Sequence, residues 1–546
     1  MSAARKRFGG VGALFFLATL GVISFYVQRQ SHSDAHEGLR KPATALPTPD
    51  EVEKPPPLPW KDRLDLAAIT LATVETAPLP AELPGVATGH ASNVNKREVA
   101  PESALYVQEL NDGHRLLYTL DPVLQQSLLQ IFRNREVPYA GAVVVDLRDN
   151  AVLALAGHSS LDAEVDPLEV VTTAWAPAAS TFKLVTAASL LENGFATPKS
   201  KICYHDGLRG ITDDLLRDDP RRDSRCNTLR TAISRSLNLV LAKLALKHLD
   251  ERHLTDTAKA FQYETEIPFE FRVETSPAHI PADARARAKV AAGFWHVDLS
   301  PVHGALIASI FARGGIYQPP HLLAHILGPD GSDLTPGPVS TRRVLSRDTA
   351  DSVGSMMVAT TVEGTARSSF FDRKGRPYVV AAKVAGKTGS LSGKRPPALN
   401  YNWFLGFAPA QQPEIAFAVV LANEPKWRIK AHYVGRRIVQ LYMARRDAIT
   451  EHRSARLTDD GVMLPRRDPE TGAIVSKANP VAGDRGAAHT PASPSGPPPA
   501  QSDPAADHLD ALPDPAHTLP PVPGPLPNPR PPSDSSTPTP TETPLR

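Results

Sequence analysis

The arrangement of apolar and polar residues divides the chain into a patterned central part and two flanks that lack a comparable pattern. In the central part, short apolar runs are separated by Asn, Asp, Gly and Pro, which is typical of strands joined by turns. Three pairs of such runs predict hairpins, at 105–110 with 115–120, at 141–146 with 152–157, and at 403–408 with 415–421. A further strand is expected at 379–387.

Other stretches of the central part repeat their apolar residues at helical spacing. They predict helices at 122–132, 177–194, 228–249, 300–312 and 433–445. Strands at both ends of this region, with helices between them, indicate an α+β domain in which helices flank one antiparallel central sheet. We assign residues 101–447 to this domain.

The helix expected at 177–194 is the part of the domain that most directly suggests chemistry. Pro177 stands at its start and Gly194 at its end, and apolar residues cover most of its circumference, so we expect it to be buried. Ser180 and Lys183 are three residues apart, which places both side chains on one face of the helix. A desolvated lysine amine favours its neutral form and can then accept the proton of a neighbouring serine hydroxyl.

The N-terminal flank has the composition of a membrane anchor. Residues 8–28 contain no charged side chain and are long enough to cross a bilayer as one helix. Basic side chains lie in residues 1–7, which predicts a cytoplasmic end and places the rest of the chain outside the cytoplasm. A cleaved signal peptide is the alternative, but no clear small-residue cleavage site follows the segment. We therefore expect an uncleaved, single-pass anchor in the cytoplasmic membrane.

The segments on either side of the domain are rich in proline. Residues 29–100 begin as a polar and then proline-rich spacer, and from residue 60 they show no clear period that would assign them to a domain. Residues 448–546 form the tail, in which Pro480 to Pro544 hold 20 of the chain's 54 prolines. Because this composition cannot bury a core, we expect the tail to be disordered. Partner binding by its proline runs is the alternative.

Charge and cysteine content narrow the functional classes. The 546 residues carry 60 basic and 58 acidic side chains, a net charge of +2 that gives no electrostatic case for a nucleic-acid partner. The two cysteines, Cys203 and Cys226, would close a loop if they paired outside the cytoplasm, which is worth roughly 3 kcal/mol on a loop-entropy estimate. Two free thiols are the alternative, and the sequence does not decide between them.

Three polar motifs follow one another along the domain, namely Ser180-Thr181-Phe182-Lys183, Ser236-Leu237-Asn238 and Lys387-Thr388-Gly389-Ser390. Further matching segments accompany them, namely Gly364-Thr365-Ala366, Trp403 to Pro409, and Ser300-Pro301 at the start of a helix. In these residues the chain resembles the penicillin-recognising serine acyltransferases, specifically the transpeptidase domain of penicillin-binding proteins. Each motif alone is a weak to moderate signal, but the ordered set is a strong one, and the resemblance covers roughly residues 105–445.

The resemblance implies a catalytic role for three of these residues. Ser180 would attack the carbonyl carbon of a D-alanyl-D-alanine stem peptide, and Lys183 would take the proton of its hydroxyl. Ser236 would relay a proton to the leaving amine. These roles supply the nucleophile and the base that an acyl transfer needs.

The same resemblance assigns binding roles to the remaining motif residues. Asn238 would hold the amide of the donor peptide, and Lys387 and Thr388, which Gly389 follows, would bind its terminal carboxylate. The backbone N–H groups of Ser180 and Ser390 would form the oxyanion hole, in which one donor is worth about 3 kcal/mol of barrier. No metal or cofactor is required.

The implied protein is a D,D-transpeptidase that cross-links peptidoglycan through a serine acyl-enzyme and is acylated by β-lactams. Its implied partners are peptidoglycan stem peptides, β-lactam antibiotics, the cytoplasmic membrane and cell-wall synthesis proteins. One alternative is a D,D-carboxypeptidase or β-lactamase on the same fold, in which water rather than an amine attacks the acyl-enzyme. Another is a non-catalytic β-lactam sensor or scaffold.

The chain departs from the family pattern in a few places. Ser390 replaces the commoner threonine, the stretch that contains the two cysteines looks like an insertion, and no second catalytic region is recognised. His158, His296 and His303 lie near apolar runs, and we interpret them as structural because a serine–lysine pair already supplies the base.

Overall fold

The computed structural model describes residues 75–78, 104–206, 210–294, 296–337, 339–393, 399–425, 429–458 and 461–463. The predicted cytoplasmic end (1–7), the membrane anchor (8–28), most of the linker (29–100) and most of the tail (448–546) lie outside these residues. Within the described ranges, no helix is both long enough and apolar enough to span a membrane.

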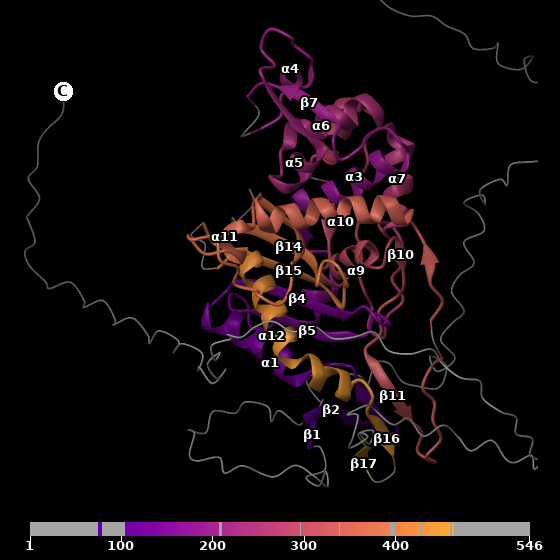
Figure 1. Ribbon diagram of the computed structural model, residues 1–546. Helices are drawn as coiled ribbons and strands as arrows, with labels where there is room; N and C mark the ends of the chain where they lie inside the picture. The colour runs from indigo at the N-terminus through magenta and orange to yellow at the C-terminus, as the bar shows by residue number, and fades with distance from the viewer. Residues whose placement is uncertain are drawn as a thin grey trace, which may run out of the picture. The chain divides into compact units, whose positions relative to one another are not determined.

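The centre of the fold is an antiparallel sheet of five strands, which confirms the predicted α+β class (Figure 1). Its strand order is β13 (Ala385–Ser392), β14 (Asn400–Ala408), β15 (Ile415–Asn423), β4 (Tyr139–Asp146) and β5 (Val152–Ser159). The predicted hairpins β4–β5 and β14–β15 join along β15 and β4, so both ends of the domain meet in one sheet. Strand β13 forms one edge of it.

Both faces of this sheet are covered, and the alternation of side chains along β15 shows how. Ala416, Ala418 and Val420 face one hydrophobic core, whereas Phe417 and Val419 face another. The second core packs under α1 (Pro122–Asn134) and α12 (Ala431–His452), both of which were predicted with shorter bounds. A strand that is buried on both faces reads as a continuous apolar run, as the sequence of β15 does.

The first core lies between the sheet and a group of helices. The helices of this group are α3 (Lys183–Glu192), α5 (Leu229–Ser234), α6 (Asn238–His248), α7 (Glu251–Ala260), α8 (Ala284–Ala291), α9 (Pro301–Ala312) and α10 (Arg347–Val362). Figure 1 shows α10 running along the sheet, with α3, α5, α6 and α7 beyond it. Helix α9 is buried over almost its whole surface, because it packs on β4, β14 and β15 at once.

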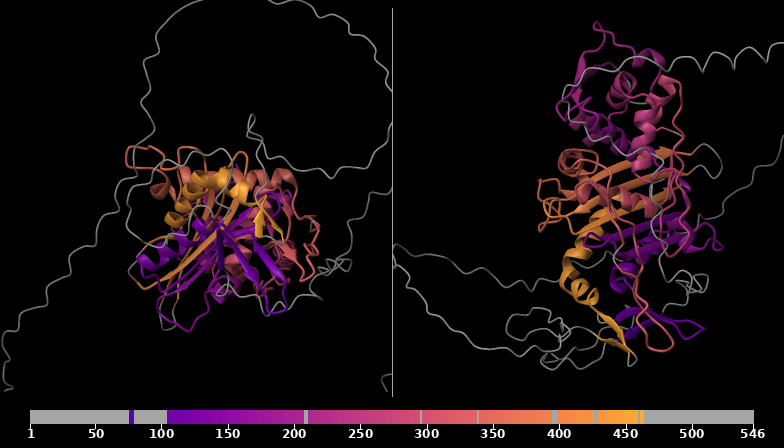
Figure 2. Two further views of the ribbon diagram at one scale, coloured as in Figure 1. Left: turned by 90° about the horizontal axis from the view of Figure 1, so that it is seen from below. Right: turned by 90° about the vertical axis from the view of Figure 1, so that its right-hand side faces the viewer.

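A second, smaller sheet lies at the end of the domain opposite α3, α6 and α7, as the right-hand view of Figure 2 shows. Its strand order is β1 (Glu75–Pro78), β2 (Ala104–Glu109), β3 (Arg115–Tyr118) and β11 (Leu323–Leu327). The β2–β3 hairpin was predicted, whereas β1 lies in a segment that the sequence pattern left unassigned. Close to this sheet, β16 (Arg456–Thr458) pairs with β17 (Gly461–Met463).

The remaining elements are short and were not predicted as separate elements. They are α2 (Pro167–Thr172), β6 (Ala176–Pro177), η3 (Ala179–Thr181), β7 (Lys201–Tyr204), α4 (Asp213–Leu216), β8 (Arg225–Thr228), β9 (Asp298–Leu299), β10 (Ile316–Tyr317), β12 (Arg342–Arg343) and α11 (Arg367–Phe370).

Three predicted elements differ from the observed ones near the candidate residues. The helix expected at 177–194 begins as the 3-10 turn η3 and becomes α-helical only at Lys183. The helix expected at 228–249 is two helices, because the chain breaks between α5 and α6. The strand expected at 379–387 starts only at Ala385 and continues to Ser392. In each case the repeat of apolar residues continues across a change in backbone conformation. The repeat alone therefore does not reveal where the element begins or breaks.

The two cysteines form a disulfide, which decides the alternative that the sequence left open. Cys203 and Cys226 face each other across the β7–β8 ladder. The loop between them carries Asp223, which forms an ion pair with the buried amine of Lys243 on α6, 2.8 Å away. The disulfide-closed segment is therefore fastened to the helix that begins at Asn238.

Candidate active site

Ser180 lies in the middle of the η3 turn, and its neighbours hold that turn in an unusual conformation. Ala179 has a φ of 51°, which is uncommon for a residue with a side chain. Gly293 approaches so closely that a Cβ there would lie 2.4 Å from the carbonyl oxygen of Ala179. The indole Nε1 of Trp403 donates a hydrogen bond to the carbonyl oxygen of Pro177, at 2.9 Å. These contacts fix the position of the serine hydroxyl.

The Lys183 side chain is fully buried, and its amine contacts the side chains of three motif residues, Ser180, Ser236 and Asn238. Its Nζ lies 2.8 Å from Ser180 Oγ, 3.1 Å from Ser236 Oγ and 2.5 Å from Asn238 Oδ1. No carboxylate in the described part of the chain forms an ion pair with this amine. Desolvation therefore moves the pKa of Lys183 well below its usual value, and the charge of Lys387 lowers it further.

Ser236 lies in the break between α5 and α6. The break arises because Ser236 adopts a φ of 56°, after which α6 begins at Asn238. This conformation turns the Ser236 hydroxyl towards both lysines, with Oγ 3.1 Å from Lys183 Nζ and 3.0 Å from Lys387 Nζ. A hydroxyl between two amines can accept a proton from one group while it donates to another.

The third motif lies on β13, the edge strand of the central sheet. Lys387 and Gly389 alternate with Thr388 and Ser390, so the two pairs point to opposite faces of the strand. Gly389 is where the strand approaches the η3 turn, since a Cβ there would lie 3.1 Å from Cγ2 of Thr181. The edge of β13 thus runs past the nucleophile candidate.

Lys387 is as buried as Lys183 but has a different set of partners. Its Nζ donates to the carbonyl oxygen of Thr388 at 2.7 Å and approaches Ser236 Oγ. Burial lowers the pKa of Lys387 to about 7. The structure thus brings Ser180, Lys183, Ser236, Asn238 and Lys387 into one hydrogen-bonded network. Thr388, Gly389 and Ser390 follow on the same strand.

Thr365 connects the third motif to the end of α5, although the sequence suggested no role for it. Its Oγ1 lies 2.5 Å from Thr388 Oγ1, and its backbone N–H donates to the carbonyl oxygen of Ser234 at 3.0 Å. Gly364 allows this approach, because a Cβ there would lie 2.1 Å from the same carbonyl oxygen. The resemblance included Gly364-Thr365 only as a flanking match.

Asn402 is a second residue that sequence reasoning missed. It is buried opposite Ser390 in the β13–β14 ladder, and its Nδ2 donates to Ser390 Oγ at 3.0 Å and to the Gly389 carbonyl oxygen at 3.3 Å. Its Oδ1 accepts a hydrogen bond from the backbone N–H of Ala431, the first residue of α12, at 2.6 Å. The signal in the sequence that could have indicated Asn402 was a polar residue directly before the apolar run of β14.

The three histidines that we interpreted as structural make contacts outside the network of Ser180 and Lys183. His303 is buried in α9, where its Nε2 lies 2.7 Å from the carbonyl oxygen of Phe261, and burial lowers its pKa to about 4. His158 stacks against Phe132, and the backbone carbonyl of His296 accepts a hydrogen bond from His279. In the described ranges no group of three or more His, Cys, Asp and Glu side chains is arranged to hold a metal ion.

The network has the parts that an acyl transfer requires. It joins the Ser180 hydroxyl to the buried Lys183 amine, whose pKa is lowered. The Ser236 hydroxyl links this amine to that of Lys387. Such a pair can activate the serine as a nucleophile without a histidine. The edge of β13 offers backbone donors and hydroxyl groups for a bound peptide.

Comparison with known proteins places this arrangement among related sequences. The family model described as "Penicillin binding protein transpeptidase domain" matches residues 140–440. The peptidoglycan D,D-transpeptidase PbpA of Mycolicibacterium smegmatis is 27% identical over 256 residues, which cover 45% of this chain and 50% of the relative. PbpA of Mycobacterium tuberculosis (H37Rv) is 29% identical over 255 residues, with the same coverage. The chain thus spans about half the length of these curated relatives.

The fold is also found among solved structures. The imipenem acyl-enzyme complex of penicillin-binding protein A from M. tuberculosis superposes with a TM-score of 0.51 at 23% identity. The match covers 61% of this chain and 80% of that one. This likeness confirms the predicted fold.

Proposed function

The chain belongs to the penicillin-binding protein transpeptidase family, as its motifs predicted, and we propose that it is a D,D-transpeptidase that cross-links peptidoglycan stem peptides. The observation that carries this proposal is the buried Lys183 amine, 2.8 Å from the Ser180 hydroxyl and without a carboxylate partner in the described residues. Curated relatives that match the chain have the same activity in their names.

Acylation begins with the neutral amine of Lys183. The amine accepts the proton of Ser180, and Oγ attacks the carbonyl carbon of the donor's penultimate D-alanine to form a tetrahedral intermediate. The Lys183 ammonium then passes its proton through the Ser236 hydroxyl to the leaving nitrogen. The distance from Lys183 Nζ to Ser236 Oγ is 3.1 Å. The C–N bond breaks, D-alanine leaves as a free amine, and the donor remains as an ester of Ser180.

Deacylation follows the same path in reverse with a different nucleophile. The amino group of an acceptor stem peptide attacks the ester carbonyl, and Lys183 takes its proton, directly or through Ser236. Collapse of the second tetrahedral intermediate breaks the C–Oγ bond and returns the proton to Ser180. One peptide bond has been exchanged for another, so no external energy source is needed.

Donor binding uses the edge of β13 and the start of α6. Asn238 holds the donor's amide, and Lys387 with Thr388 and Ser390 forms the pocket for its terminal carboxylate. A carboxylate at that place restores the charge of Lys387, whose pKa burial lowers to about 7 in the free protein. The backbone N–H groups of Ser180 and Ser390 are our candidates for the oxyanion hole.

β-Lactams would acylate the same serine, because their ring carbonyl occupies the place of the donor's scissile carbonyl. We further propose that the domain works outside the cytoplasm, tethered by residues 8–28. The Cys203–Cys226 disulfide supports this location, since disulfides persist in oxidising compartments.

The assignment of the nucleophile is tested by labelling with a fluorescent penicillin. We expect the wild-type chain to be labelled covalently and the Ser180→Ala variant not to be, with equal thermal unfolding of the two proteins as the control. Equal labelling of both proteins would show that Ser180 is not the nucleophile.

Product analysis then separates the transpeptidase from the carboxypeptidase or β-lactamase alternative. The chain is incubated with a D-alanyl-D-alanine stem peptide and an amine acceptor, and the products are identified by mass spectrometry. The proposal predicts the cross-linked peptide together with released D-alanine. Hydrolysed donor alone, at saturating acceptor, would assign the chain to the alternative.

A further inference from the structure

Exposed apolar side chains gather at a pocket that is distinct from the candidate active site. Of the four large apolar side chains that are exposed in the described residues, Val362 and Val380 line this pocket, and Tyr378 lies beside it in the chain. The fourth, Leu161, is not among its lining residues. Val380 is 88% exposed, which is unusual for a side chain of its kind.

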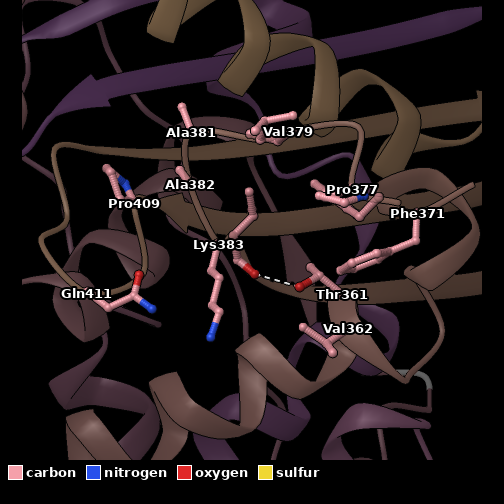
Figure 3. Close-up of a pocket in the computed structure, with 13 residues that line it drawn as sticks. Thr361, Val362, Phe371, Pro377, Val379, Ala381, Ala382, Lys383, Pro409 and Gln411 are labelled. Atoms are coloured by element: carbon pink, nitrogen blue, oxygen red, sulfur yellow. Dashed lines mark hydrogen bonds between the residues drawn. The ribbon is translucent and has the colours of Figure 1, made fainter. Parts of the chain in front are cut away.

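We call this cavity the Lys383 pocket. It has a volume of about 390 Å³ and is lined by Thr361, Val362, Phe370, Phe371, Pro377, Val379, Val380, Ala381, Ala382, Lys383, Val384, Pro409 and Gln411. Figure 3 shows Lys383 and Gln411 on one side of it and Phe371 with Pro377 on the other. None of its lining residues belongs to the proposed catalytic network.

Three cations lie in the lining or next to it. The Arg367 guanidinium lies 5.5 Å from the ring centre of Phe371, the Arg436 guanidinium lies 4.5 Å from that of Tyr378, and Lys383 itself lines the pocket. No carboxylate of the described chain forms an ion pair with these three cations. This surface is therefore apolar at its centre and positive at its rim.

The nearby carboxylates are already engaged. Asp372 accepts hydrogen bonds from the Arg376 side chain at 2.7 Å and from the backbone N–H groups of Lys374 and Arg376. Glu363 forms an ion pair with Arg230. The positive rim is thus not neutralised by the segment that builds it.

The wall of the pocket argues against a small ligand. Pro377 and residues 379–383 form it, and most of their side chains are exposed, so a small molecule would stay largely in contact with water. A second copy docked in twofold symmetry would bring the same cations face to face. A flat bilayer would leave the cavity unfilled. A peptide segment can fill the cavity with an apolar side chain and place carboxylates next to the cations of the rim.

We propose that the Lys383 pocket binds an acidic segment of a partner protein, which inserts an apolar side chain between Val362 and Val380. Carboxylates on either side of that anchor meet Lys383, Arg367 and Arg436. An apolar centre with a charged rim that contains Arg and Tyr is the usual anatomy of a protein interface.

Selection from a random peptide library tests this proposal. Phage that display peptides of about 12 residues are selected on the immobilised full chain and depleted on a Val380→Ser/Lys383→Glu variant. We expect enriched peptides to carry Asp or Glu on both sides of a bulky apolar residue. A synthetic copy should bind about tenfold more weakly to each single variant, Val380→Ser or Lys383→Glu, than to the wild type.

Matched variants elsewhere control for general effects. Leu161→Ser removes an exposed apolar side chain that does not line the pocket, and Lys259→Glu reverses an exposed charge on α7; neither should change the affinity. Labelling by fluorescent penicillin, compared across all variants, confirms that each is folded. The proposal is overturned by no enrichment, by peptides that bind Lys383→Glu as tightly as wild type, or by enriched peptides without acidic residues. Binding to phosphatidylglycerol vesicles that Val380→Ser abolishes would instead assign the surface to a membrane.

Discussion

Two buried lysines that lie on or next to helix α6 have opposite surroundings. The difference distinguishes a lysine that can act as a base from one that stabilises the fold. Lys243, on α6 itself, has its Nζ 2.8 Å from Asp223 and 3.1 Å from Asp218. Lys183 contacts Asn238, the first residue of the same helix, and its other partners are hydroxyl groups and a carbonyl oxygen. A lysine that pairs with carboxylates holds two segments together. A lysine without them is destabilised in its charged form and can act as a base.

The titration of the neighbouring groups supports this contrast. Desolvation on its own would raise the pKa of Asp223, but hydrogen bonds from Lys243 and His205 hold it below its usual value. Around Lys183 no carboxylate of the described residues offsets desolvation, and the nearby Lys387 adds repulsion, so its pKa falls. The same residue type therefore serves either as a structural cation or as a base, depending on its partners.

The largest effect is expected from Lys183→Met. Removal of the base leaves the Ser180 hydroxyl without a proton acceptor, so we expect penicillin acylation to slow by roughly 10²–10⁴-fold. A time course of labelling with fluorescent penicillin measures this rate. Lys243→Met is the matched control, and its rate should stay near that of the wild type at temperatures where it is folded. Similar rates for wild type and Lys183→Met would break the comparison.

Lys243→Met should act on stability instead. The substitution leaves the carboxylate of Asp223 buried without its cation, which costs about 3–5 kcal/mol of unfolding free energy. Chemical denaturation measures the loss, and Asp223→Asn added to Lys243→Met should recover part of it. An unchanged unfolding midpoint would mean that the pair contributes nothing to the fold.

Removal of the disulfide tests whether the segment it closes is only structural. In Cys203→Ser/Cys226→Ser we expect a loss of roughly 3 kcal/mol, because the 23-residue separation is no longer constrained in the unfolded chain. Thermal unfolding measures this loss, and penicillin acylation at 25 °C should be retained. If acylation disappears while the protein stays folded, the disulfide-closed segment shapes the active site, and the proposal that it is only structural is wrong.

The pH dependence of acylation sharpens the role of Lys183. The amine must be neutral to accept the proton, so the rate rises with pH through the Lys183 pKa and is lost below it. Because burial places that pKa well below 10.5, the rising limb should lie well below the range of an exposed lysine. Lys387→Gln removes a neighbouring charge, which raises the Lys183 pKa and moves the limb to higher pH. A limb that moves to lower pH would contradict this assignment.

The smallest effect is expected at Asn402, which acts through Ser390. Asn402→Asp keeps the acceptor for Ala431 N–H but loses the donor to Ser390 Oγ. We expect the second-order rate constant of acylation to fall about tenfold, as for one lost hydrogen bond to a positioned group. The loss should come from weaker binding rather than from the acylation step, which single-turnover kinetics separates. An unchanged constant would show that Ser390 does not depend on this contact.

The sequence predicted best what is local or periodic. The Ser180–Lys183 spacing, the two hairpins of the central sheet and α9 follow from residues a few positions apart. The break at Ser236 was missed because the apolar period of 228–249 continues through it, and the left-handed φ of one serine leaves no trace in that period.

Other features depend on contacts between distant segments. Thr365 and Asn402 act on Thr388 and Ser390 from other elements, so only the fold shows that they meet. The two thiols pair because the β7–β8 register places them opposite each other. The Lys383 pocket is built from segments around Thr361, 370–384 and Pro409, which no single stretch of sequence could indicate.

The charge state of Lys183 in the free protein is the most direct test of this account. Nitrogen-15 NMR of labelled lysine Nζ atoms, with the resonance assigned by its absence in Lys183→Met, follows the titration of this one amine. We predict a midpoint well below 10.5, because burial destabilises the ammonium form of this amine. An amine that remains an ammonium up to the usual lysine pKa of about 10.4 would contradict the proposed role of Lys183 as the base.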